Sequence, residues 1–199
     1  MLKELSREFN LQLCLDCVSS LGVVKCDLGG VALASGVSGK GLRSMAGLAL
    51  VFHNGNLPEP MRPLPRYLDL RMYTSNGVPF TIPSNLVAAL SVSLETLDAP
   101  TRCNEVRETA DWLCEKLRET GLKPLAAEAD RFPGAITLVV PPNISSSELG
   151  YTLQREGWLL SYKSQYLADR NWIQVCLLGH TKRSDLEPLT AILAAKVKN

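Results

Sequence analysis

The sequence contains no apolar run that approaches the roughly 18 residues of a membrane-spanning helix. Its first residues, MLKELSREFNLQLCLD, lack the small-residue cleavage pattern of a secretory signal peptide. Neither charge is in excess, because 21 Lys and Arg residues are balanced by 20 Asp and Glu residues. These absences argue against a membrane protein and against a nucleic-acid partner, and they predict a cytoplasmic protein.

Metal-ligand patterns are also scarce. Cys14 and Cys17 form one Cys-x-x-Cys pair, but no second Cys or His pair stands at the spacing of a zinc site. In a strand, residues three apart point to opposite faces, so this pair is poorly placed to chelate. His53 and His180 are far apart in the sequence and form no metal-ligand pair. We therefore expect reduced core thiols and no bound metal.

The remaining composition, 46% hydrophobic and 21% charged, is that of an ordinary globular protein. In the first half, short apolar runs at 11–15, 31–34 and 48–52 predict buried strands of parallel type. A short helix is predicted at 2–9, and Gly and Pro in 54–65 indicate a surface loop. A parallel sheet needs helices on both faces. The first half has few of them, so we expect it to be part of a larger sheet.

The second half has a different pattern. Pro83 is expected to open a helix, with Ser84 or Thr81 as its cap. A longer helix is predicted at 101–120, with Val106, Ala110, Leu113 and Leu117 on one stripe and Gly121 as its end. Further on, we predict strands at 135–140, 158–161 and 172–178 and helices at 147–156 and 185–197. Together these elements describe a small α+β domain over 101–199.

One pair of residues has a specific chemical use. Asp16 ends the first predicted strand, and Lys40 lies in a Gly- and Ser-rich loop after the next one. Pyridoxal phosphate needs a buried carboxylate beside its ring nitrogen and a lysine that forms a Schiff base with its aldehyde. The alternative is that Asp16 is a turn former and Lys40 an ordinary loop residue.

Four segments resemble the class V aminotransferases, which are fold type I pyridoxal-phosphate enzymes. They are DCVSSLG at 16–22, ASGVSGKGLRSMAGLALVF at 34–52, VPFTIPSNLVAALSVSLE at 78–95 and IQVCLLGH at 173–180. They occur in the family's order. The resemblance implies the C-terminal part of such a fold, a partial and mostly parallel sheet followed by a small α+β domain. Residues 1–100 would be the second half of the cofactor-binding large domain plus a linker helix, and 101–199 the small domain.

The resemblance also implies roles for individual residues. Asp16 would pair with the pyridine nitrogen, Val18 would lie against the ring, and Lys40 would be the Schiff-base lysine and the catalytic base. Ser38 would lie near the phosphate, and Thr81 would reach the phosphate of the neighbouring subunit's cofactor. Family members are dimers with the active site at the interface, so a homodimer is expected.

The chain also departs from the family pattern. Members are considerably longer and place a stacking aromatic and a phosphate-cradling turn before the position where this sequence starts. Gln174 stands where they carry an arginine that grips the substrate carboxylate by a two-pronged ion pair. Arg170 or Lys163 is a candidate substitute. Gly39 stands where many relatives have a polar side chain near the phosphate.

Three hypotheses follow. The first is a class V aminotransferase present as its C-terminal half, either as a truncated or split product or with a partner that supplies the missing N-terminal half. It would move an amino group between an amine or amino acid and a keto acid or aldehyde. The second is a catalytically inactive remnant that acts as a binding or assembly subunit. The third is a lyase or desulfurase relative, although Cys103, Cys114 and Cys176 lie in no recognisable catalytic loop.

Overall fold

A computed structural model describes residues 2–55, 57–74 and 78–198 of the chain. It separates into two compact units. The first unit comprises Met1–Leu21 and Cys26–Leu97, and the second comprises Gly22–Lys25 and Asp98–Asn199. In the described part of the chain, no helix is both long and apolar enough to cross a membrane.

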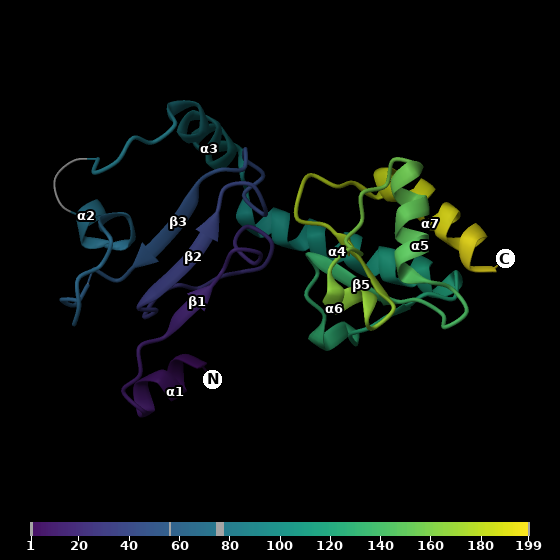
Figure 1. The fold of residues 1–199 in the computed structure, drawn as a ribbon, viewed down its shortest axis with the longest axis horizontal. Coiled ribbons are helices and arrows are strands. Elements are labelled where there is room, and N and C mark those ends of the chain that lie inside the picture. Colours follow the sequence, from purple (N-terminus) through teal and green to yellow (C-terminus); the bar gives the residue numbers. More distant parts are fainter. Residues whose placement is uncertain (1, 56, 75–77, 199) are drawn as a thin grey trace. The chain divides into compact units, whose positions relative to one another are not determined.

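The first unit is built on three strands that lie side by side (Figure 1). Its elements are α1 (Leu2–Glu8), β1 (Cys14–Asp16), β2 (Leu33–Val37), β3 (Ala49–His53), the 3-10 turn η1 (Arg66–Leu68), α2 (Arg71–Thr74) and α3 (Ser84–Thr96). β1 runs parallel to β2, with Asp16 opposite Ser35, whereas β3 runs antiparallel to β2, with Val51 opposite Ser35. The predicted, mostly parallel sheet is therefore wrong, and this sheet is mixed. The reason is that the short segment 38–48 reverses the chain without the crossover that a parallel strand needs.

A small apolar cluster packs against this sheet. Cys17, Val31 and Ala34 form a small buried cluster, and Leu13, Leu15, Leu21 and Leu28 pack against it. The expectation of fully buried strands is wrong here, because β1 and β3 keep most side chains exposed. The apolar helix α3 is also exposed, since none of its residues is buried. An apolar helix and sheet face left in water normally mark a surface that another segment covers.

The second unit is a small α+β domain with its own core. Its elements are α4 (Ala99–Glu119), β4 (Lys123–Pro124), the 3-10 turn η2 (Glu128–Asp130), β5 (Ala135–Val139), α5 (Ser146–Arg155), α6 (Gln165–Ala168), β6 (Trp172–Cys176) and α7 (Arg183–Lys198). The sheet is antiparallel in the order β4-β5-β6. The run 158–161 is not a strand, since Ser161 alone bridges to Gln174. β4 and α6 were not predicted.

Periodicity explains the core of the second unit. The inward residues of β5 and β6 alternate with outward ones, so Ile136, Leu138, Ile173 and Val175 all face the core. They meet the stripe predicted for α4, which is fully buried at Val106, Ala110, Leu113 and Leu117. Gly121 follows α4 with a φ of 93°, as expected of a residue just beyond a helix end. Val23, from the short segment 22–25, completes this cluster.

Candidate functional site

Asp16 lies at the carboxyl end of β1 with its carboxylate held by two donors. The Val18 backbone N–H donates to Asp16 Oδ1 at 3.0 Å, and the Ser35 hydroxyl donates to the same oxygen at 2.8 Å. These hydrogen bonds, with a smaller contribution from the charge of Lys40, lower the pKa of Asp16 below its usual value. The side chain is exposed rather than buried, which corrects the sequence-based expectation. Asp16 is therefore held in its charged form.

Lys40 lies in the turn that follows β2, and its side chain is partly buried. Its ammonium Nζ donates a hydrogen bond to the Ser19 hydroxyl at 2.9 Å. Because β1 and β2 are parallel, their carboxyl ends meet at one edge of the sheet, so the segments that follow them lie close together. The electrostatic effect of Lys40 on Asp16 reflects this proximity.

A shallow hollow of about 390 Å³ lies against Asp16. Its lining comes from all three strands and consists of Cys14, Leu15, Asp16, Leu33, Ala34, Ser35 and Val51. The hollow offers a carboxylate and an apolar lining to a ring that carries a protonated nitrogen. Lys40 does not line the hollow but lies within electrostatic range of Asp16, where an amine could meet the aldehyde. The residues present therefore fit the two reactive ends of pyridoxal phosphate.

The loop between Ser38 and Leu48 is tightly folded. Ser38 is fully buried, and its hydroxyl donates to the Met45 carbonyl at 2.6 Å and accepts from the Leu48 N–H at 3.2 Å. This serine closes the loop that carries Lys40, and its predicted contact with a phosphate stays a prediction. A Cβ added at Gly39 would lie 2.6 Å from the Ala46 Cβ, so the chain has no room there for the polar side chain of the relatives.

Val18 and Thr81 also stay predictions as cofactor contacts. Val18 follows β1 and is half-buried. Thr81 is exposed and precedes α3, whose N-cap is Pro83 without a side-chain hydrogen bond. Neither predicted cap, Ser84 or Thr81, is therefore used.

The second unit contains the three residues considered for substrate binding, Gln174, Lys163 and Arg170. Gln174 lies on β6, donates from Nε2 to the Thr137 hydroxyl at 2.8 Å and lines a hollow of about 410 Å³. Lys163 lines the same hollow. Arg170 does not, because its guanidinium stacks 4.0 Å from the Tyr166 ring centroid and donates to the Tyr166 carbonyl. Of the two candidate replacements for the missing arginine, Lys163 is thus the one beside Gln174.

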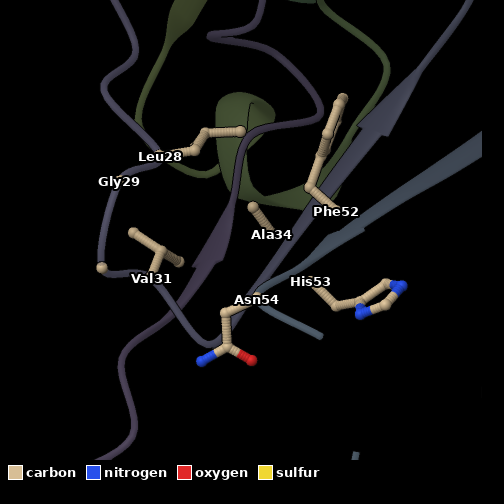
Figure 2. Close-up of a pocket in the computed structure, with 8 residues that line it drawn as sticks. Leu28, Gly29, Val31, Ala34, Phe52, His53 and Asn54 are labelled. Carbon is tan, nitrogen blue, oxygen red and sulfur yellow. The ribbon is translucent and has the colours of Figure 1, made fainter. Parts of the chain in front are cut away.

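Another hollow of the first unit has a different character (Figure 2). The volume of this hollow is about 350 Å³. Its lining is apolar and includes Leu28, Val31, Ala34 and Phe52, and His53 and Asn54 lie at its edge. The His53 Nδ1 accepts a hydrogen bond from the Gly55 N–H at 3.0 Å. Within the described ranges, no group of three or more His, Cys, Asp or Glu residues is placed to hold a metal ion.

Sequence reasoning missed two residues of the site, Ser19 and Ser35. Ser19 belongs to the DCVSSLG segment, so its proximity to Lys40 had a signal in the motif. Ser35 had none, because its contact with Asp16 depends on the register of β1 against β2.

Comparison with known proteins identifies the fold of the chain. No family model and no curated protein matches the chain. Among solved structures, an alanine–glyoxylate aminotransferase from Nostoc sp. matches with a TM-score of 0.88 at 23% identity, over 100% of this chain and 56% of that one. This chain has the fold of part of a class V aminotransferase. A ureidoglycine–glyoxylate aminotransferase from Bacillus subtilis has the same TM-score and coverage at 17% identity.

The aminotransferase fold is shared with enzymes of other chemistry. A cysteine desulfurase from Thermococcus onnurineus matches with a TM-score of 0.74 at 9% identity, over 99% of this chain and 55% of that one. The chain thus spans little more than half of each of these proteins. The fold type I resemblance is confirmed, whereas reaction and substrate have to be argued from the site.

Proposed function

We propose that this chain is the C-terminal part of a pyridoxal-phosphate-dependent aminotransferase of class V type. The observation that carries the proposal is the pair formed by Asp16 and Lys40, one held as a carboxylate and the other as a hydrogen-bonded amine at the same sheet edge. The reaction is amino-group transfer between an amine or amino acid and a keto acid or aldehyde.

Each residue of the site has a defined task in this reaction. When bound, pyridoxal phosphate supplies the electron sink for the charge that develops at the substrate Cα. Asp16 keeps a proton on the ring nitrogen by its negative charge. Lys40 would hold the cofactor through its aldehyde and, as a free amine, would move a proton to and from the substrate Cα. Val18 would lie against the ring, and Ser38 and Thr81 would contribute to the phosphate site.

The exposed surface of the first unit supports a partner. β1 and β3 are the edge strands of the sheet, and α3 exposes apolar side chains such as Val92. The matched aminotransferases contain more polypeptide than this chain, since it covers 56% of them. We propose that a segment equivalent to their remaining part covers this surface, in the same polypeptide or in a partner, and that the assembly is a homodimer.

One observation favours a second candidate, a catalytically inactive assembly subunit. Gln174 provides an amide where a carboxylate-binding arginine would be charged, and its Nε2 already bonds Thr137. Retention of Asp16 and Lys40 in contact with hydroxyl partners favours the enzyme instead. For the desulfurase alternative, Cys114 is a poor nucleophile, because it is buried and burial raises its pKa, and the exposed Cys176 lies on strand β6 rather than in a loop.

Absorbance spectroscopy separates these candidates. The purified chain mixed with pyridoxal phosphate is expected to develop a visible band, and Lys40→Ala is expected to abolish it. Borohydride should remove the band of the wild type, because it reduces the Schiff base to a secondary amine, and should leave the cofactor covalently attached. Lys182→Ala, an exposed lysine of the second unit, is the matched control and keeps the band. Glyoxylate is the first acceptor to assay, since the names of two matched structures include it. Absence of a Lys40-dependent band would contradict the proposal for this chain.

A further inference from the structure

Each of the two charged groups of the site bonds a neutral serine hydroxyl. Lys40 Nζ contacts the Ser19 hydroxyl at 2.9 Å, and Asp16 Oδ1 contacts the Ser35 hydroxyl at 2.8 Å. An ammonium and a carboxylate that approach within about 4 Å of each other form an ion pair. Here, in the described part of the chain, each group bonds a serine rather than the other charged group.

The two serines come from different elements. Ser35 projects from the middle of β2 directly opposite Asp16 in the sheet register, so the strand pairing itself fixes its hydroxyl. Ser19 lies in the turn that follows β1. The residue before it, Val18, donates its backbone N–H to Asp16. Asp16 is thus bonded by a serine of strand β2, and Lys40 by a serine of the turn after β1.

We propose that Ser19 and Ser35 are positioning residues that keep Lys40 and Asp16 apart in the cofactor-free chain, so that the space between them stays open. This inference rests on the proposed function, since it assigns that space to the cofactor ring. A direct ion pair would close the space and would have to be broken before the ring could enter. A hydroxyl bond costs less to exchange, because a neutral partner holds an ammonium more weakly than a carboxylate does.

Replacing either serine by alanine is expected to shift the pKa of Asp16, and the two shifts are expected to have opposite signs. Ser35→Ala removes a donor from the Asp16 carboxylate and is expected to raise the pKa of Asp16. Ser19→Ala frees Lys40 to contact Asp16 and is expected to lower that pKa further. A merely structural loss of either serine would not produce two shifts of opposite sign.

The experiment measures the Asp16 carboxyl by carbon NMR in the full chain, with carbon-13-labelled aspartate and without cofactor. Asp16→Asn assigns the signal. Ser91→Ala, an exposed serine of α3, is the matched control and should leave the pKa unchanged. Ser19→Thr and Ser35→Thr retain a hydroxyl and should return the pKa toward the wild-type value. A thermal melt confirms that each variant is folded.

Cofactor uptake provides the second readout. Ser19→Ala is expected to weaken pyridoxal phosphate binding about fivefold, the effect of one exposed ion pair that must first be broken. Unchanged Asp16 titration in both alanine variants, or shifts of the same sign, overturns the inference whether or not the chain binds cofactor. Opposite shifts without a Lys40-dependent visible band support the separation of the charges and overturn the proposed function.

Discussion

Gly39, immediately before Lys40, offers a sharp test of the site. An added Cβ would lie 2.6 Å from the Ala46 Cβ and 2.7 Å from the Ala46 Cα, closer than a Cβ atom approaches other heavy atoms in proteins. One of these two Ala46 atoms is backbone, so the clash cannot be relieved by rotating a side chain. Overpacking of this kind costs about 1–3 kcal/mol. We therefore expect Gly39→Ala to lower the free energy of unfolding of the first unit by about 2 kcal/mol.

Chemical denaturation followed by circular dichroism measures this loss, and cofactor absorbance measures its effect on Lys40. Ala46→Gly added to Gly39→Ala removes the clash with the side chain of residue 46 but not the clash with its backbone, so the double variant should recover only part of the stability. Gly29→Ala is the control, because its Cβ would meet only the Asp27 carboxylate, at 3.2 Å. Wild-type stability in Gly39→Ala, or no coupling with Ala46→Gly, would refute the tight loop.

Three further predictions concern charged groups. The pKa of Asp16 is lower in the folded state than its usual value of 3.8, so the ionised Asp16 side chain stabilises the fold fully above pH 3.8. This stabilisation is lost as the pH falls through the folded-state pKa. Urea unfolding at decreasing pH should therefore show a shrinking difference in stability between wild type and Asp16→Asn. Lys163→Ala should raise the KM for a keto acid about fivefold, whereas Arg170→Ala, stacked on Tyr166, should not; equal effects would contradict their placement. Arg102 is buried and donates to the carbonyls of residues 177–179, so Arg102→Met should destabilise the second unit by about 3 kcal/mol in thermal or urea unfolding.

The second unit was largely predictable because its periodicities are unambiguous. The heptad-like spacing of Val106, Leu113 and Leu117 specifies the buried face of α4 whatever else is present. The run 158–161 misled because its apolar residues resemble a strand, whereas only Ser161 pairs with β6. β4 could not have been found, since it comprises just Lys123–Pro124.

The first unit was predicted less well, for a physical reason. Apolar runs at 31–34 and 48–52 carry no information about strand direction, which the intervening turn decides. The burial of β1 and β3 was overestimated. An apolar strand is expected to be covered, but its sequence does not show which segment covers it. The proximity of Asp16 and Lys40 followed from parallel strand ends, but Ser35 depended on the register.

The segment Gly22–Lys25 belongs to the second unit although both of its neighbours along the chain belong to the first. The polypeptide therefore passes between the units three times, after Leu21, after Lys25 and after Leu97. A single cut at Leu97 would remove the fully buried Val23 from the core it completes and leave a void there. The two halves of this chain are consequently not interchangeable modules, and recombination at one junction, in the laboratory or in a genome, would not transfer the second unit intact.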